Sequence, residues 1–477
     1  MQNGNSPQLV RTLGLFATFI VTVSAVIGSG VYKKVAPMAA ELGSPTLVLI
    51  GWVVAGLITL FGALSNAEVA SLMADAGGEY VYFKKIYNRF FAFLFGWSCF
   101  TVIRSSALAS IAYVFSQSFN NIIPLPTLPD HIASIEWLGI FTPFDNFGVK
   151  LLTILLIGAL TVFNIFGLKS GESLSRYVLL SVIASMLLVI ILGLTTGGGS
   201  LSIFTQSSPS HNPGPWYSFE FIQHFFAAML AAFWAYEGWS STGYLGSEIK
   251  NANRNLPLAL VSGVIFIIII YVLMNFTYLY ILPVDQIIDA HQSQNTIAAI
   301  AVVKSFMGNQ GALFMSLLIL FTTFGATNST VLPPPRLYYA MARDGFFFRL
   351  ASYVHPVYRT PSKALVLQAV WASLLVLSGS FDQLTDMLVF ASFIFYGATT
   401  LGVFILRYKM PDVERPYKAW GYPVVPAIFI LFCLILITVT CMTKPREALL
   451  GLGLMATGIP FWIYWNKKVN EKKSGDF

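Results

Sequence analysis

Two apolar segments of membrane length are interrupted at matching positions, and this pairing restricts the possible folds more than any other feature of the chain. The first segment runs from about 13 to 38 and is broken at Ile27-Gly28-Ser29-Gly30. The second runs from about 219 to 245 and is broken at Tyr236-Glu237-Gly238-Trp239. An unpaired backbone amide or carbonyl inside lipid costs several kcal/mol, so a helix is not opened there without a reason. The usual reason is a polar solute bound near the bilayer midplane, which predicts a transporter.

The composition places the whole chain in the membrane. Of its 477 residues, 56% are hydrophobic and only 10% are charged, whereas a soluble protein carries about a quarter charged residues. A spanning helix needs roughly 20 apolar residues. We therefore expect an all-α membrane protein with one transporter domain over 1–477, no separate soluble domain and no cleavable signal peptide. Twelve spans are expected near 13–38, 44–72, 90–119, 150–167, 174–196, 219–246, 257–282, 309–339, 364–379, 386–407, 423–442 and 448–466.

The basic residues predict the orientation of these spans. With the N-terminus drawn inside, 21 of the 28 Lys and Arg residues fall on one side. The opposite loops near 120–148, 197–218, 283–303 and 380–385 contain no Lys or Arg. This asymmetry follows the positive-inside rule and predicts that both termini are cytoplasmic, in the cell (inner) membrane. The net charge of +7 therefore reflects orientation, and we expect no nucleic-acid partner.

The two broken segments are the first and the sixth span. Their positions predict two five-helix repeats of inverted topology, at about 11–198 and 218–408. Two extra helices follow at about 420–467.

Several motifs occur along the chain in an order that is similar to one transporter group. They are Ile27-Gly28-Ser29-Gly30-Val31-Tyr32, Asn66-Ala67-Glu68, Gly77-Gly78-Glu79-Tyr80-Val81-Tyr82, Phe233-Trp234-Ala235-Tyr236-Glu237-Gly238-Trp239, Asn255-Leu256-Pro257, Arg336 to Gly345, His355-Pro356, Thr360-Pro361 and Pro411 to Pro416. The set resembles the amino acid–polyamine–organocation superfamily, and within it the L-type amino acid transporters. The resemblance implies a LeuT-like fold, with helices 1 and 6 unwound at the midplane, and amino acids as substrates.

Two stretches depart from the resembled pattern. The family often carries a Lys in the middle of the fifth helix, in place of a sodium ion, whereas this chain has Ser181-Val182. The coupling mode therefore stays open. Pro333-Pro334-Pro335 replaces a stretch that is usually small and polar, and three prolines must disrupt the end of the eighth helix.

The first break offers a binding site for the carboxylate of an amino acid. Opening a helix leaves amides free at the start of the next half-helix, where the helix dipole favours an anion. The resemblance assigns this role to the amides of Gly28, Ser29 and Gly30, with the Ser29 hydroxyl as a further donor. The alternative is a packing motif, because small residues let membrane helices approach closely.

Carbonyls beside both breaks, and Glu237 in the second, are candidates for binding the substrate ammonium group. The resemblance also places Trp234 at an aromatic gate that is commonly Phe; the alternative is that Trp234 only packs between helices. The expected substrate-binding residues are Val26, Ile27, Gly28, Ser29, Gly30, Phe233, Trp234, Ala235, Tyr236, Glu237 and Gly238.

Glu237 has three possible roles. A carboxylate at the midplane is costly unless it is paired, protonated or hydrated, which makes it a functional candidate. It would bind the substrate ammonium, carry a proton, or cap the amides of the second half-helix. Arg104, deep in the third span, needs a partner, and Glu237 and Glu68 are the candidates. Lys33 and Lys34 either line an outer vestibule or extend to the membrane surface, and we favour the second reading.

Ion coupling has weaker candidates. Thr322 and Thr323, with Asn328, Ser329 and Thr330, cluster where the resembled fold holds Na⁺, although such side chains more often join helices by hydrogen bonds. Ser181 and Glu237 are further coupling candidates, so Na⁺ or H⁺ is the possible coupling ion. No metal site is assigned, and no cofactor is expected. Cys99, Cys433 and Cys441 all lie within apolar spans, so we expect no disulfide-linked heavy-chain partner.

The sequence thus favours a secondary transporter of amino acids, with small neutral L-amino acids ahead of cationic amino acids or polyamines because Glu237 is the only clear acidic cavity residue. The chain shows no phosphate-cradling loop, nucleophile elbow or metal-ligand cluster, so we do not expect an enzyme. A channel or a nutrient receptor on a transporter scaffold is the alternative of another class.

Overall fold

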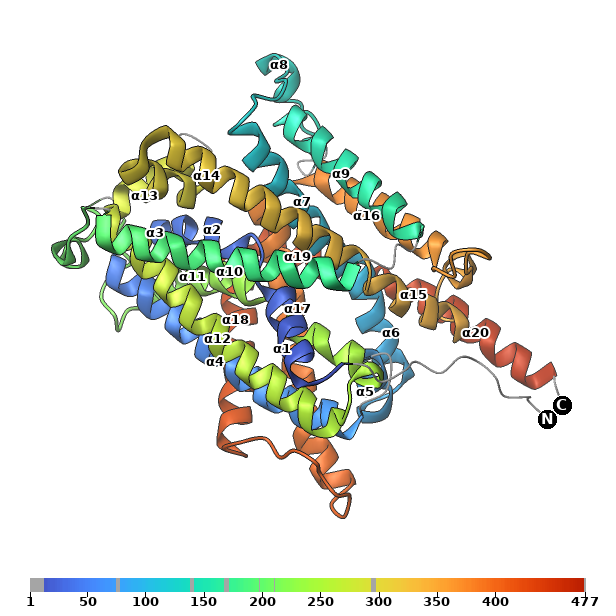
Figure 1. The fold of residues 1–477 in the computed structure, drawn as a ribbon. Helices are drawn as coiled ribbons and strands as arrows, with labels where there is room; N and C mark the ends of the chain where they lie inside the picture. The colour runs from blue at the N-terminus through green and yellow to red at the C-terminus, as the bar shows by residue number, and fades with distance from the viewer. Residues whose placement is uncertain are drawn as a thin grey trace.

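The computed structural model describes residues 13–475 except 74–77, 138–140, 167–170, 197, 210 and 293–296. These described residues form helices and two isolated β-bridges, Leu13 with Ile249 and Trp137 with Phe141, and no strand. Among them are nine helices long and apolar enough to cross a membrane. The protein is therefore an all-helical, multi-pass membrane protein (Figure 1).

In the first part of the chain, the described residues form twelve helical elements. They are α1 (Leu15–Val26), α2 (Gly30–Lys33), α3 (Val35–Leu42), α4 (Pro45–Leu72), α5 (Glu79–Ile86), α6 (Arg89–Ser98), the π-helical turn η1 (Cys99–Ile103), α7 (Arg104–Asn120), α8 (Asp130–Ala133), α9 (Phe147–Ile165), α10 (Gly171–Thr196) and the short 3₁₀ turn η2 (Leu201–Thr205).

The second part continues in the same way. Its helices are α11 (Phe219–Tyr236), the 3₁₀ segment η3 (Trp239–Glu248), α12 (Ala252–Ile281), α13 (Val284–Gln292), α14 (Ala298–Val331), α15 (Pro334–Arg343), the 3₁₀ turn η4 (Arg349–Ser352), α16 (Ser362–Ser378), α17 (Phe381–Lys409), α18 (Val424–Thr443), α19 (Pro445–Ala456) and α20 (Gly458–Gly475).

Both predicted breaks are confirmed. Helix α1 ends at Val26, and the chain becomes helical again at Gly30. Helix α11 ends at Tyr236 and continues as η3 from Trp239. Ile27 and Glu237, the first residue after each half-helix, both have extended backbone with ψ of 102° and 148°. Each break therefore leaves backbone groups without partners in its own helix.

The long helices α4 and α12 lie side by side, and α1 packs on α12 (Figure 1). Gly56 of α4 permits the close approach, because a Cβ there would lie 2.6 Å from Cγ1 of Ile268. Small residues serve this purpose in membrane helices, where lipid supplies no hydrophobic driving force for association. Helices α9 and α16 form a second packed pair.

The bundle has two distinct ends. Helices α5, α15 and α20 lie at one end, and α8 and α13 lie at the other (Figure 1). We call the first end the basic side, because Lys84, Arg336 and Arg407 belong to it. There the Lys84 ammonium pairs with Asp344 at 3.0 Å, which joins α5 to the residue that follows α15.

The proline triplet interrupts the eighth span as predicted. Helix α14 ends at Val331, and α15 begins with Pro334 and Pro335 in its first two positions. Proline is tolerated there because the first amides of a helix have no helical acceptor. The triplet thus separates α14 from the short helix α15, which carries Arg336. Helix α14 consists of two helices that meet at a sharp kink at Gly308 (φ 64°). The second begins where the eighth span was predicted, at about 309, and the first, which starts at Ala298, precedes that span.

Candidate functional site

One cavity of about 880 Å³ connects both helix breaks with the basic side. Its deep end is lined by the two breaks and by Arg104 of α7. Its mouth is lined by Phe16, Arg336 and Tyr358, and Phe16 is 66% exposed. The cavity therefore reaches the surface at the basic side.

The first break presents backbone groups and a hydroxyl to this cavity. Gly28 lines the cavity, and a Cβ built on it would find only the Val26 carbonyl oxygen, at 3.8 Å. The Tyr271 hydroxyl donates to that carbonyl at 3.1 Å and also interacts with the amide of Gly28. Ser29 is 1% exposed, and its hydroxyl has no hydrogen-bond partner among the described residues. Of the groups expected to bind substrate here, the Val26 carbonyl and the Gly28 amide therefore already have a protein partner.

Gly30 has a packing role in addition to any role in binding. A Cβ on Gly30 would lie 2.4 Å from Cα and 2.6 Å from Cβ of Ala235. The start of α2 thus packs directly on the end of α11, which is the packing alternative considered above. Close approach of a ligand is a better explanation for Gly28 than for Gly30, because Gly28 alone of the two has open space at the Cβ position.

The second break is shaped by Gly238. Its φ of 110° lies in a region that L side chains rarely adopt, and a Cβ would lie 2.2 Å from the carbonyl oxygen of Ala25. Only glycine satisfies both constraints. The break therefore packs against the end of α1, and Glu237 is held at the junction of the two half-helices.

The Glu237 carboxylate has partners from two other helices. The Tyr396 hydroxyl of α17 donates to Oε1 at 2.7 Å. Nη1 of Arg104 lies 4.0 Å from the same oxygen, and the side chains of Arg104 and Glu237 are 11% and 7% exposed. The amide of Gly238 forms a further hydrogen bond to the carboxylate. Arg104 thus pairs with Glu237 and not with Glu68, and the carboxylate is placed by three groups while still lining the cavity.

The predicted binding residues divide into two groups. Those that line the cavity are Val26, Ile27, Gly28, Ser29, Gly30, Trp234, Glu237 and Gly238. Phe233, Ala235 and Tyr236 do not line it. Instead the Phe233 ring packs on Phe393, and the Tyr236 hydroxyl donates to the Trp52 carbonyl at 3.1 Å.

A buried seal closes the end of the cavity opposite its mouth. The Trp234 ring lines the cavity and packs edge-on against Phe381 of α17, at 6.0 Å between centroids. Lys33 Nζ lies 4.1 Å from the centroid of the Phe381 ring. Lys34 Nζ donates to Asp382 Oδ1 and to Thr385 Oγ1, both at 2.7 Å. We refer to these residues as the outer seal.

The reading that Lys33 and Lys34 extend to the membrane surface is wrong. The two residues are only 4% and 1% exposed, and Lys33 Nζ donates to Gln117 Oε1 at 2.6 Å. Burying an ammonium is costly unless it is paired and hydrogen-bonded. Both side chains therefore turn inward, because α7 and α17 supply polar partners that the sequence could not reveal.

The ion-coupling candidates are dispersed in the structure. Thr322 and Thr323 are buried, and their hydroxyls donate to carbonyls of their own helix at 2.7 Å and 2.6 Å. Asn328 lines the cavity and accepts a hydrogen bond from Asn164 at 2.8 Å. Ser181 is exposed on α10 and does not line the cavity. The described residues contain no group of three or more His, Cys, Asp or Glu that could hold a metal ion.

Comparison with known proteins identifies the family of the chain. The model of a family described as amino acid permease matches residues 13–464. The chain belongs to this family. It is similar to the serine/threonine exchanger SteT of Bacillus subtilis, with 28% identity over 96% of this chain and 97% of the relative.

Two mammalian relatives extend the comparison. The b(0,+)-type amino acid transporter 1 of Mus musculus is 28% identical over 95% of this chain and 88% of its own length. The human large neutral amino acids transporter small subunit 2 is 27% identical over 98% of this chain and 83% of its own length. The predicted membership of the amino acid–polyamine–organocation superfamily, with L-type amino acid transporters among the relatives, is confirmed. These relatives are transporters and not enzymes.

Two residues of the site were missed by sequence reasoning. Tyr396 and Tyr271 each lie in an apolar helix, where a tyrosine ordinarily packs with its hydroxyl on any available carbonyl. Neither has a neighbouring motif that would mark it. Tyr396 lies 159 residues from Glu237 in the sequence, and only the fold brings the two together.

Proposed function

We propose that the protein is a secondary active transporter of small neutral L-amino acids in the cell membrane. It works by alternating access, as an exchanger or as an ion-coupled symporter. The observation that supports this best is the cavity of about 880 Å³ that joins both helix breaks and extends to Phe16, Arg336 and Tyr358 on the basic side. In the proposed topology the chain has twelve spans in a LeuT-like arrangement, and both termini and the cavity mouth face the cytoplasm.

The binding mode follows from the charges around the deep end of the cavity. The substrate carboxylate lies at the start of α2, near the unpartnered Ser29 hydroxyl, where amides favour an anion. The ammonium group lies at Glu237. The substrate side chain points toward Trp234, whose bulk favours small side chains. The relative that is named a serine/threonine exchanger supports both small substrates and exchange.

Transport of cationic amino acids is the second candidate. Glu237 lines the cavity and would attract a second positive charge. Arg104 lines the same cavity at 4.0 Å from Glu237 and opposes that charge. Because the two side chains offset each other, a zwitterion fits this site better than a cation does.

Counterflow in proteoliposomes tests the proposal. Vesicles loaded with unlabelled L-alanine should accumulate labelled L-alanine transiently, and serine and threonine should compete better than lysine. Repeating the measurement with and without Na⁺, and with and without a pH gradient, distinguishes exchange from ion coupling. A channel gives no counterflow, so purified protein that equilibrates label without overshoot would overturn the proposal.

A further inference from the structure

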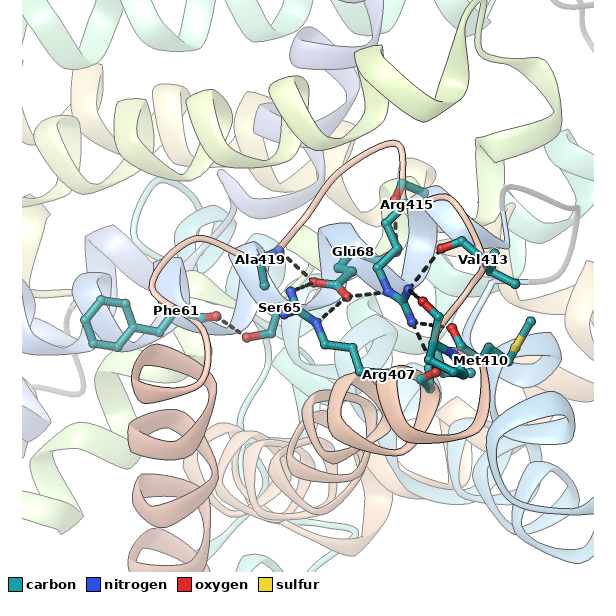
Figure 2. Close-up of polar contacts among 11 residues, drawn as sticks. Phe61, Ser65, Glu68, Arg407, Met410, Val413, Arg415 and Ala419 are labelled. Carbon is teal, nitrogen blue, oxygen red and sulfur yellow. Dashed lines mark hydrogen bonds and ion pairs between the residues drawn. The ribbon is translucent and has the colours of Figure 1, made fainter.

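Glu68 is a buried carboxylate that the proposed binding site does not use. It lies near the C-terminal end of α4, on the basic side, and is 1% exposed. A carboxylate at this depth is stable only with partners. Figure 2 shows that these partners come from the end of α17 and from the chain that follows it.

The partners bind Glu68 from three positions. Arg407 of α17 forms a fork, with Nε donating to Oε1 at 2.9 Å and Nη2 donating to Oε2 at 2.7 Å. The amide of Ala419 donates to Oε2 at 2.6 Å. Nε of Arg415 lies 3.3 Å from Oε1. We call Glu68, Arg407, Arg415 and Ala419 the Glu68 cluster.

Arg415 also closes the end of α17. Its Nη2 donates to the carbonyls of Leu406 at 3.1 Å and Met410 at 2.9 Å, and its Nη1 donates to the Val413 carbonyl at 3.0 Å (Figure 2). The last carbonyls of a helix have no helical donor, and a cation satisfies them well. The Glu68 cluster therefore joins α4, the end of α17 and the segment 410–419 into one unit.

Helix α17 makes a polar contact at three levels, and these contacts are regularly spaced. Thr385 binds Lys34 in the outer seal, Tyr396 binds Glu237, and Arg407 binds Glu68. Successive residues are eleven positions apart, which is about three helical turns or roughly 16 Å, with only about 20° of rotation. The three side chains thus share one face of α17, so a shift of the helix moves all three contacts together.

We propose that Glu68 and Arg407 are positioning residues for transport. They fix the height and rotation of α17, and so hold the Tyr396 hydroxyl on Glu237 and hold Thr385 and Asp382 on Lys34. The inference rests on the proposed function, since it assigns the Glu68 cluster a role in the site and in the outer seal. Glu68 touches no substrate; it acts through α17.

The chemistry of the cluster supports positioning over simple stabilisation. A buried ion pair is weak evidence for stability, because a well-packed apolar pair often stabilises as well. A planar guanidinium on a carboxylate, in contrast, fixes distance and orientation through two parallel hydrogen bonds. A shift of α17 by about 1 Å away from Glu237 would lengthen the Tyr396–Glu237 contact, now 2.7 Å, beyond hydrogen-bond range.

The test uses a cysteine in the cavity wall as a probe of sidedness. Ile111 lines the cavity, so Ile111→Cys is placed in a background in which Cys99, Cys433 and Cys441 are replaced. A membrane-impermeant thiol reagent is then applied to either side of oriented vesicles. In the parent, labelling should come from the basic side, because the outer seal blocks the other route.

Arg407→Lys keeps the charge and removes the fork. We expect labelling from the sealed side to rise about fivefold or more, and the maximal counterflow rate to fall about tenfold, the equivalent of one charge-assisted hydrogen bond. Glu68→Gln should likewise raise the labelling from the sealed side and lower the counterflow rate. It replaces Arg407→Lys in the test if that variant does not fold. The matched control is Glu136→Gln, which removes an exposed pair with Arg446 (3.9 Å) and should change neither quantity.

Two outcomes would overturn the inference. One is a folded Arg407→Lys or Glu68→Gln protein with the parental labelling ratio and rate. The other is a lower melting temperature with an unchanged labelling ratio, which would leave the cluster a purely stabilising role. The labelling needs no transport, so a parent without counterflow would contradict the proposed function while the positioning of α17 is still measured.

Discussion

The two helix breaks share their packing and differ in their chemistry. Each has a glycine pressed against the half-helix that precedes the other break: Gly30 against Ala235, and Gly238 against Ala25. The first break presents mainly backbone groups and one hydroxyl to the cavity. The second presents the Glu237 carboxylate, placed by Tyr396 and Arg104.

The first break therefore suits the part that all amino acids share, whereas the second break can determine which amino acid is preferred. A backbone amide is present whatever the side chain, so the first break suits the carboxylate that every amino acid carries. The electrostatic field at the second break depends on the side chains of Glu237, Tyr396 and Arg104, and it changes when any of them is replaced. Substrate preference should therefore respond to substitution at the second break more than at the first.

The largest effect is expected from Gly238→Ala, which disrupts the packing of the second break against Ala25. The new Cβ would require a positive φ and would overlap the Ala25 carbonyl, so we expect a loss of stability of more than about 2 kcal/mol. Thermal unfolding in detergent measures it. Gly28→Ala is the matched control: it has room for the Cβ and should melt near the wild-type temperature while losing transport. Equal stability of the Gly238→Ala and wild-type proteins would contradict the packing role.

The next effect tests the carboxylate of the second break. If Glu237 binds the substrate ammonium, Glu237→Gln should raise the apparent substrate constant at least about tenfold at every pH, because a charge-assisted hydrogen bond is lost. If Glu237 carries a coupling proton, net uptake should instead lose its pH dependence while one-for-one exchange persists. If Glu237 only caps η3, both measurements should stay near wild type. We expect the first result, from uptake and exchange compared between about pH 5.5 and 8.

Arg104→Gln should shift the charge preference of the site by a smaller factor. Without the guanidinium at 4.0 Å, the Glu237 carboxylate is no longer offset, and a second positive charge on the substrate becomes favourable. We expect the ratio of lysine to alanine uptake to rise about fivefold. Competition assays with both amino acids check this, and an unchanged ratio would mean that Arg104 does not contribute to the field felt by the substrate.

The smallest effect is expected at Trp234, where shape and not charge is altered. Trp234→Phe enlarges the cavity near Phe381 and should re-rank substrates toward bulkier side chains without abolishing transport. One methylene in such a pocket is worth about 1–3 kcal/mol. A panel of alanine, valine and leucine measures the ranking. If the order is unchanged, Trp234 only packs between α11 and α17.

The breaks and the helical course could be predicted from the sequence because both depend on local signals. Apolar runs of spanning length predict helices, and polar or glycine residues inside these runs predict the breaks at Gly28 and Gly238. The proline triplet likewise marked the end of α14 through its missing amides.

The partners of the charged residues could not be predicted, because they come from distant parts of the chain. Nothing near Lys34 in the sequence indicates Asp382, so the lysine resembled one that extends to the membrane surface. Arg104 had two candidate carboxylates, and only the fold decides for Glu237. The packing role of Gly30 could not be predicted either. A glycine that packs closely on Ala235 looks the same in the sequence as one that lets a ligand approach the backbone.

The junction of α14 and α15 bears on how quickly a substrate leaves. Pro334 and Pro335 occupy the first two positions of α15 beside the cavity mouth, and the amide of Arg336 is already bonded to the Pro333 carbonyl. A helix start usually retains anions with its free amides, but this one has none to offer in its first three residues. If the protein transports amino acids as proposed, a departing substrate carboxylate would meet no free backbone amide at the start of α15, which would favour rapid release on the basic side.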